Sequence, residues 1–334
     1  MRTATTFTKT TFAAATLGLT LASGIAFAQP APEDATYLAI GDSLAYGFAT
    51  VFTTPRTFGD RGYVAPFADW LATQNQGVRP AVINTAVPDE TTASFFDGPA
   101  IGYIYNSNYS LFFPDTQAET VADRVGGQLA EGRTIRWISA QFGANDLLDL
   151  ADESGFLNQP VLDQQTQAIA AIGEAITRYE SILDSVVASL PEARLIVMGY
   201  YNPFPGSPAN SLNDLAAFGA PILNTELASM AGRLGATFVP VFDIFVGREA
   251  ELTFMDTDED IHPEPLGYQL IAERMIEIAA CPADFTGDGV LDFFDVLEYL
   301  ALFDATDPAA DLTGEGSLDF FDVLEFLARF DQGC

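Results

Sequence analysis

The chain is poor in positive charge. Its 334 residues hold 14 lysines and arginines against 46 aspartates and glutamates, which gives a formal net charge of -32. Lys9 is the only lysine, so arginine is the only strong cation in the rest of the chain. Because a surface of this kind repels nucleic acids and anionic membranes, we expect neither as a partner.

The sequence also lacks a long hydrophobic run, since no segment approaches the roughly 20 uninterrupted apolar residues of a membrane span. The apolar stretch from Phe12 to Phe27 is short and is broken by Thr, Ser and Gly. Arg2 and Lys9 precede it, and it ends at the small-x-small site Ala26-Phe27-Ala28, as a secretory signal peptide does. We predict that residues 1–28 direct export and are removed, a retained membrane anchor being the alternative. The mature protein would then be extracellular, on the cell surface or periplasmic, without a membrane span.

Cysteine is scarce: Cys281 and Cys334 are the only two, and they bracket the last segment of the chain. In an exported protein such a pair predicts a disulfide, with two free thiols as the alternative. The bond would stabilise the segment by about 4 kcal/mol in the chain-entropy model. The composition also changes at Cys281, which predicts one domain over residues 29–280 and a small second one over residues 281–334.

Short apolar runs alternate with helical periods between residues 35 and 280. The runs are rich in Val, Ile and aromatic residues and are bounded by Gly, Pro, Asn or Asp, as buried strands are. They are Tyr37–Ile40, Ala81–Ile83, Ile135–Phe142, Leu195–Tyr200 and Thr237–Phe245. This alternation predicts an α/β domain with a parallel sheet covered on both faces. In such sheets the functional site lies at the carboxyl ends of the strands.

Three polar motifs follow predicted strands. A serine at a strand-to-helix turn, as in Gly41-Asp42-Ser43-Leu44, is exposed where a nucleophile must be. In Gly143-Ala144-Asn145-Asp146, the Asn145 amide can donate a hydrogen bond to an oxyanion. His262, in Asp258-Glu259-Asp260-Ile261-His262-Pro263, is the only histidine and therefore the only imidazole base for a serine. Each motif taken alone also fits a helix cap, a turn or a solvated loop.

Taken in order, and with Asn84–Thr91 as a further block, these motifs resemble the SGNH (GDSL) hydrolase superfamily. The resemblance spans nearly all of residues 35–280. It implies a three-layer, flavodoxin-like α/β/α domain that cleaves carboxylic esters through an acyl-serine intermediate, with no cofactor for catalysis. It further implies Ser43 as nucleophile and His262 as base. The oxyanion donors would be the backbone N–H of Ser43, a backbone N–H of the Asn84–Thr91 block and the Asn145 amide.

Two positions depart from the family pattern. Asp89 stands where the family has glycine, and its side chain adds negative charge near a developing anion and tolerates positive φ less well. Glu259 stands where the family has an aspartate, three residues before the histidine, and Asp258 and Asp260 flank it. We expect Glu259 to orient His262, with Asp260 as the next candidate. The alternative function is a catalytically weakened or inactive scaffold that acts as a surface or binding protein.

The segment after Cys281 is an internal repeat, in which Ala283–Gly289 returns as Ala310–Gly316 and Asp292–Glu298 as Asp319–Glu325. Each copy places oxygen ligands at positions 1, 3, 5, 7, 9 and 12 of a loop with glycine at position 6, which is the spacing of a calcium loop. The predicted ligands are Asp284, Thr286, Asp288, the Val290 carbonyl, Asp292 and Asp295 in the first copy, and Asp311, Thr313, Glu315, Ser317, Asp319 and Asp322 in the second. An Asp-Gly turn repeat without an ion is the alternative.

This repeat resembles a dockerin type I-like module, a small all-α unit of two calcium loops and two helices. The resemblance implies structural Ca²⁺ and a protein partner or anchoring role for the tail. It also favours an acylated carbohydrate as substrate, because such modules often accompany polysaccharide degradation. The aromatic-rich stretch Phe95–Pro114 favours a lipid ester or another small ester with an acyl chain instead. The sequence leaves the two substrate classes open.

The calcium prediction can be tested on the isolated segment 281–334. Calcium is expected to raise its melting temperature, because an ion that binds only the folded state stabilises that state. Thermal unfolding followed by circular dichroism, with calcium and then with excess chelator, measures the effect. An unchanged melting curve after chelation would count against the ion sites.

Overall fold

The computed structural model describes most of the chain from Ala35 onward. The described residues are 35–48, 61–75, 77–98, 116–204, 211–258, 260–280, 283, 285, 291–307, 310, 312–313 and 317–332. The predicted signal peptide, both cysteines with their predicted disulfide, and most of the stretch Phe95–Pro114 lie outside them, as do Glu259 and the predicted calcium ligands Asp284, Thr286, Asp288, Val290, Asp311 and Glu315. Within the described ranges, none of the helices has the length and apolar character needed to span a membrane.

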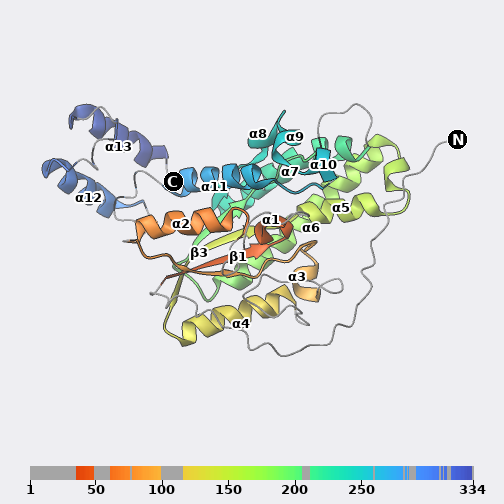
Figure 1. Cartoon of the computed structure of the whole chain (residues 1–334), viewed down its shortest axis with the longest axis horizontal. Helices are drawn as coiled ribbons and strands as arrows, with labels where there is room; N and C mark the ends of the chain where they lie inside the picture. The colour runs from red at the N-terminus through yellow and green to blue at the C-terminus, as the bar shows by residue number, and fades with distance from the viewer. Residues whose placement is uncertain are drawn as a thin grey trace. The chain divides into compact units, whose positions relative to one another are not determined.

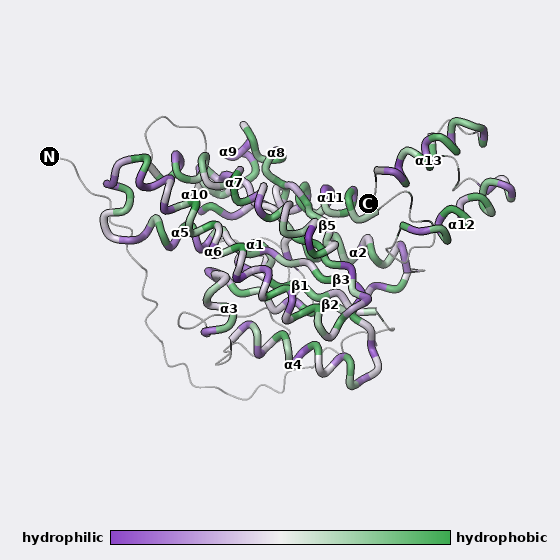
Figure 2. The backbone as a smooth tube through the Cα atoms, turned by 180° about the vertical axis from the view of Figure 1, so that it is seen from behind, coloured by the Kyte–Doolittle hydropathy of each residue, from purple (hydrophilic) through white to green (hydrophobic). Residues whose placement is uncertain are grey.

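Five parallel strands form a single sheet in the order β2-β1-β3-β4-β5. Each neighbouring pair is parallel, and Leu38 of β1 pairs with Ile83 of β2 on one side and with Ile138 of β3 on the other. The strands are β1 (Ala35–Gly41), β2 (Ala81–Asn84), β3 (Thr134–Gln141), β4 (Arg194–Met198) and β5 (Thr237–Val239). Hydrophobic residues lie along β1 and along the edge strand β2 (Figure 2). The structure therefore confirms the predicted parallel sheet.

The last predicted strand, Thr237–Phe245, was too long. β5 ends at Val239, and the second half of the predicted strand folds instead as the short helix α8 (Phe242–Phe245). The reason is Pro240, which has no N–H to continue the strand ladder. The apolar pattern alone could not mark this break, because the side chains on both sides of it are hydrophobic.

Helices cover both faces of the sheet. On one face, the Tyr37 ring of β1 contacts Phe67 of α2 (Val64–Gln74) with ring centroids 5.3 Å apart. On the other face, Phe142 at the end of β3 contacts Tyr179 of α6 (Val161–Val187) at 5.1 Å. Figure 1 shows α2 and α11 on one side of the strands and α4 on the other. The described helices of this domain are α1 (Ser43–Tyr46), α2, α3 (Ser94–Asp97), α4 (Gln117–Ala130), α5 (Ala144–Asp152), α6, α7 (Ser211–Leu234), α8, α9 (Glu249–Leu252), α10 (Met255–Asp258) and α11 (Pro265–Ala279), with a 3-10 turn at Phe156–Asn158.

The C-terminal segment contains two helices, α12 (Phe293–Asp304) and α13 (Phe320–Gln332). They begin at equivalent positions of the two repeat copies. The rings of Tyr299 and Phe326 stack between them, 4.2 Å apart and nearly parallel. Together with Ala283 and Ala310 these residues form a small buried core of the segment. The two short helices of the segment therefore contact each other through these buried side chains.

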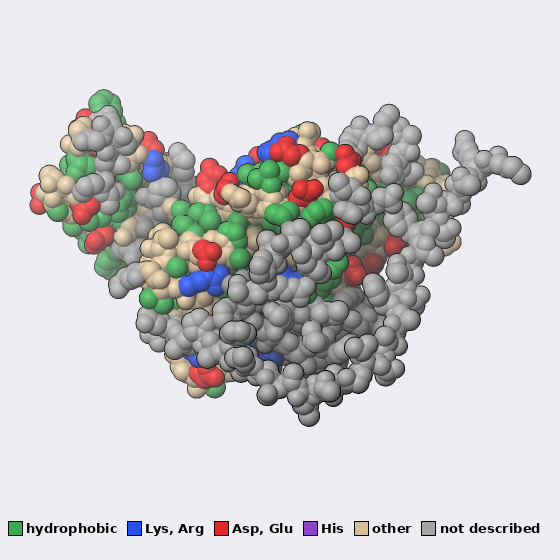
Figure 3. Space-filling view, in the orientation of Figure 1, with side chains coloured by type: hydrophobic (Ala, Val, Ile, Leu, Met, Phe, Trp, Pro, Cys, Tyr) green, Lys and Arg blue, Asp and Glu red, His purple; other side chains and the backbone are tan. Residues whose placement is uncertain are grey.

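On the face that Figure 3 shows, acidic side chains are scattered over the described residues, with few arginines among them. This distribution agrees with the formal net charge of -32. The charge is not gathered over one element in this view, so it opposes association with anionic partners in general and does not mark a particular binding site.

Gly41, the last residue of β1, has no room for a side chain. Its φ is +139°, and a Cβ built there would lie 2.4 Å from the carbonyl oxygen of Gln141 on β3. We predict that Gly41→Ala lowers the free energy of unfolding by about 3 kcal/mol, because the methyl group forces β1 and β3 apart in a conformation that L-residues disfavour. The matched control is Gly173→Ala on α6, where no atom lies within 4 Å, and it should stabilise by about 1 kcal/mol. Urea unfolding of both variants measures the difference, and equal effects would contradict the packing argument.

Candidate active site

Ser43 lies just after the carboxyl end of β1. β1 ends at Gly41, Asp42 is the N-cap of α1, and Ser43 is the first residue of that helix. The Asp42 carboxylate accepts a hydrogen bond from the N–H of Leu44 at 2.9 Å, which fixes the turn. Ser43 is thereby held at a strand-to-helix turn, at the sheet edge where the sequence predicted it.

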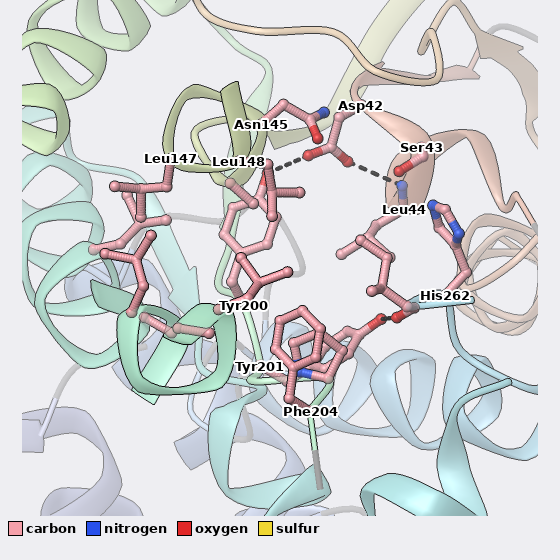
Figure 4. A pocket seen from close by; sticks show the side chains of 18 residues that line it. Asp42, Ser43, Leu44, Asn145, Leu147, Leu148, Tyr200, Tyr201, Phe204 and His262 are labelled. Carbon is pink, nitrogen blue, oxygen red and sulfur yellow. Dashed lines mark hydrogen bonds between the residues drawn. The ribbon is translucent and has the colours of Figure 1, made fainter. Parts of the chain in front are cut away.

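The loop before α11 carries His262. An antiparallel bridge joins Thr253 to Pro263, and the N–H of Phe254 donates to the His262 carbonyl oxygen at 3.1 Å. The Tyr201 hydroxyl donates to the neighbouring carbonyl oxygen of Ile261 at 2.7 Å. These contacts bring the only histidine to the same pocket that Ser43 lines, and Figure 4 shows its ring beside Ser43.

The carboxylate of Asp260 contacts the imidazole. Its Oδ1 is hydrogen-bonded to Nδ1 of His262 and also accepts the His262 backbone N–H at 3.1 Å. Asp260 is buried, with 9% of its surface exposed. Glu259, the first candidate from the sequence, lies outside the described residues. Asp260, the second candidate, therefore lies where an orienting acid is needed.

Asn145 lies in the first turn of α5, directly after β3, and lines the same pocket as Ser43. Its amide Nδ2 donates to the carbonyl oxygen of Glu90 at 2.9 Å. Asp89, the residue before Glu90, has a φ of +63° and an exposed side chain. Asp89 thus adopts the left-handed conformation that glycine favours, and aspartate is among the residues that tolerate it best. Asp89 therefore has a backbone conformation that is also open to the glycine that the family pattern places here.

Asp146 joins the two loops that flank the site, a role that the sequence did not reveal. Its buried carboxylate accepts the backbone N–H of Thr92 at 3.0 Å and the Thr92 hydroxyl at 2.6 Å. Arg178 of α6 donates to both partners, at 2.9 Å to the Thr92 hydroxyl and at 3.1 Å to Asp146. The loop after β2 and the start of α5 are therefore fixed to each other.

Glu90 and Gln117 form a second buried network, which the sequence also did not reveal. Gln117 of α4 accepts the Gly41 N–H and donates to the Gly41 carbonyl oxygen, both at 2.9 Å, and donates to Glu90 at 2.8 Å. The Ser94 hydroxyl also donates to the Glu90 carboxylate. Burial raises the pKa of Glu90 to about 7, against the lowering effect of the hydrogen bonds from Ser94 and Gln117. The network connects the end of β1 to the turn that holds Asp89.

The Asp42 carboxylate is enclosed beneath Ser43. The Tyr200 hydroxyl, from the segment after β4, donates to it at 2.5 Å. Burial raises the pKa of Asp42 to about 6, while the hydrogen bonds from Tyr200 and Leu44 and the nearby His262 lower it. Burial, together with the neighbouring Asp42, raises the pKa of Tyr200 well above its usual value, so the phenol stays protonated as a donor. The Asp42–Tyr200 pair therefore supports the turn that holds Ser43.

A cavity opens from Ser43 and His262 between α5 and α7 (Figure 4). The space between its lining residues, including the part that is open to solvent, is about 730 Å³. Its polar groups gather at the end with Ser43, His262 and Asn145. The rest of the wall is largely hydrophobic and includes Leu147, Leu148, Phe204, Leu212, Leu215 and Leu223.

Known proteins show similarity at the level of family and fold. A sequence model of the GDSL-like Lipase/Acylhydrolase family matches residues 39–270. No curated protein matches the sequence. The lipase Lip_vut3 from a goat rumen metagenome has 18% identity and a TM-score of 0.52, over 73% of this chain and 96% of that one. A catalytic mutant of Axe2, an acetylxylan esterase from Geobacillus stearothermophilus, has 16% identity and a TM-score of 0.45, over 73% of this chain and 93% of that one.

The buried Glu90 carboxyl predicts a specific pH dependence of stability. Its pKa is about 7 when folded, against an ordinary value of 4.5, so the folded state binds the proton more tightly. As pH rises from about 4.5 to about 7, the unfolded chain ionises first, and the free energy of unfolding falls by up to about 3 kcal/mol. Glu90→Gln should lack this component.

The measurement is urea unfolding of wild type and Glu90→Gln at several pH values. The stability difference between the two proteins should shift in favour of Glu90→Gln as pH rises through this window. Replacement of the exposed Glu153 by glutamine is the control and should leave the shape of the wild-type curve unchanged. Parallel curves for wild type and Glu90→Gln would contradict the prediction.

Proposed function

The chain belongs to the GDSL-like lipase/acylhydrolase family and is a carboxylic ester hydrolase, and we propose that Ser43, His262 and Asp260 form its catalytic triad. The observation that carries this proposal is the hydrogen bond from His262 Nδ1 to the buried Asp260, made at the pocket that Ser43 lines. A carboxylate on Nδ1 holds the ring in the tautomer whose Nε2 can accept a proton from serine.

In the proposed reaction, Nε2 of His262 takes the Ser43 hydroxyl proton as Oγ attacks the ester carbonyl carbon. The carbonyl π electrons move to oxygen and form the tetrahedral oxyanion. When this intermediate collapses, the bond to the alcohol oxygen breaks and His262 returns the proton to the leaving alcohol. Water then attacks the acyl-serine by the same sequence and releases the carboxylic acid. The residues supply all proton transfers, so no cofactor is needed for catalysis.

We assign the oxyanion donors to the backbone N–H groups of Ser43 and Asp89 and to the Asn145 amide. The amide has two hydrogens. One binds the Glu90 carbonyl oxygen at 2.9 Å, which orients the group, and the other is assigned to the oxyanion. Donors fixed before the substrate arrives stabilise the developing charge without reorganisation. The left-handed Asp89 keeps its N–H in the glycine-like geometry, which argues against the inactive-scaffold alternative.

Hydrolysis of short p-nitrophenyl esters by four proteins tests the triad. Relative to wild type, Ser43→Ala and Asp260→Ala are each expected to lower kcat by a factor on the order of 10³ or more. Glu259→Ala is the matched control, because it removes the neighbouring acid, and should retain most of the activity. A fluorophosphonate probe should label wild type and not Ser43→Ala.

Two outcomes would count against this assignment. Equal rates for wild type and Ser43→Ala would remove Ser43 as the nucleophile. A large loss in Glu259→Ala, with Asp260→Ala nearly normal, would transfer the orienting role to Glu259. Circular dichroism of each variant separates loss of chemistry from loss of folding.

For the rest of the chain we propose export by residues 1–28 and a calcium-binding tail that tethers the enzyme to a protein partner or anchor. The tail proposal is supported by the repeat and by its two equivalent capped helices. Asp295 and Asp322, at the twelfth loop positions, are buried and accept the backbone N–H groups of Asp292 and Asp319 at 2.9 and 2.8 Å. The described part of the tail brings no three acidic side chains together, and most of the remaining predicted ligands lie outside it.

A further inference from the structure

We propose that the cavity beside Ser43 binds the acyl chain of the substrate, and that the enzyme prefers esters of linear aliphatic acids over acetylated carbohydrates. This inference rests on the proposed function of Ser43. It assigns a substrate class that neither the sequence nor the family membership decides.

The wall chemistry is the first argument. Leucines of α5 and α7 and the ring of Phe204 line the cavity, and among these Leu215, Leu223 and Phe204 are nearly inaccessible to solvent. A carbohydrate presents hydroxyl groups on several sides, and burying them against leucine side chains leaves them without hydrogen-bond partners. An alkyl chain loses no hydrogen bond when it enters the same space.

The hydroxyl groups in the wall are the second argument. Tyr200 and Tyr201 line the cavity, but each phenol is already engaged. The Tyr200 hydroxyl donates to Asp42 at 2.5 Å, and the Tyr201 hydroxyl donates to the Ile261 carbonyl oxygen at 2.7 Å. Both tyrosines therefore contribute mainly ring surface to the cavity. In the described part of its lining, polar side chains remain only at the catalytic end, where Asp42, Ser43, Asn145 and His262 lie.

The position of the imidazole distinguishes the acyl side from the alcohol side. His262 must hand its proton to the leaving alcohol, so the alcohol lies next to that ring. Figure 4 shows His262 beside Ser43, with Leu147 and Leu148 across the cavity from both. The hydrophobic interior thus extends away from the leaving group, and the chain attached to the carbonyl carbon is the part of the ester that enters it.

The expected selectivity follows from the burial of methylene groups. Each one transferred from water to an apolar wall raises transition-state affinity by about fourfold. Hexanoate has four more methylenes than acetate. Because these groups contact the wall only in part, the gain is smaller than the fourfold factor multiplied four times. We therefore expect kcat/KM for p-nitrophenyl hexanoate to exceed that for the acetate by roughly tenfold or more.

Two alanines of α7 provide a matched test. Ala216 lines the cavity, whereas its neighbour Ala217 does not and is exposed. In the mature enzyme, Ala216→Phe should lower kcat/KM for the hexanoate by roughly tenfold or more relative to kcat/KM for the acetate, because the ring fills space that only the longer chain uses. Ala217→Phe should leave kcat/KM unchanged for both substrates.

Further substrates separate the remaining possibilities. Ethyl hexanoate and hexyl acetate carry the same carbons on opposite sides of the ester bond, and the proposal predicts faster cleavage of ethyl hexanoate. An acetylated xylo-oligosaccharide, assayed by acetate release, is expected to be a poorer substrate than either p-nitrophenyl ester.

The proposal is overturned by a flat chain-length profile, by preference for hexyl acetate or the acetylated sugar, or by an equal effect of Ala216→Phe on both p-nitrophenyl esters. If hydrolysis in these cases still depends on Ser43, the proposed catalytic triad is retained and only the acyl-chain assignment is rejected. If the enzyme hydrolyses no ester and is not labelled by the fluorophosphonate, the proposed function is rejected, and the assignment of the cavity to the acyl chain is rejected with it. The wild-type profile alone decides the matter if Ala216→Phe does not fold.

Discussion

The hydrogen bond between the Asp260 carboxylate and Nδ1 of His262 is the interaction on which the proposed chemistry depends. A neutral imidazole accepts a proton at one nitrogen only, and a buried carboxylate on Nδ1 selects Nε2 for that task. The loop that carries both residues is bridged at Thr253 and Pro263 and held by Tyr201. Without this fixation the only histidine of the chain would lie in a solvated acidic loop with no defined tautomer.

The opposite side of the site depends on buried polar groups that join elements distant in sequence. Gln117 and Glu90 connect the end of β1 to the turn at Asp89, and Asp146 with Arg178 connects that turn to α5. Two carboxyls in this region have raised pKa values because they are buried, about 6 for Asp42 and about 7 for Glu90. Their burial lowers stability near neutral pH, while their hydrogen bonds hold the Ser43 turn and the proposed oxyanion donors in place before substrate binds.

Local features of this molecule were predictable from the sequence and features set by long-range contacts were not. The strand before Ser43 and the strand-to-helix turn that holds it are determined by adjacent residues, so both were predicted. The expected exposure of Ser43 was not, because neighbouring elements leave only 8% of its surface accessible. The strand at Thr237 was predicted too long because Pro240 acts through a missing N–H and not through hydropathy. Whether Glu259 or Asp260 faces His262 depends on how the loop is bridged. A sequence pattern cannot distinguish two neighbouring acids in this respect. The Glu90–Gln117 pair joins separate helical and loop segments, and no periodicity encodes it.

The central claim can be measured on a single side chain. Because His262 is the only histidine, NMR of nitrogen-labelled protein reports the tautomer of its imidazole without ambiguity. The account predicts that the neutral ring carries its proton on Nδ1, hydrogen-bonded to Asp260, and that Asp260→Ala removes this preference. A neutral ring protonated on Nε2 in the wild-type enzyme would contradict the account, since no lone pair would then face Ser43.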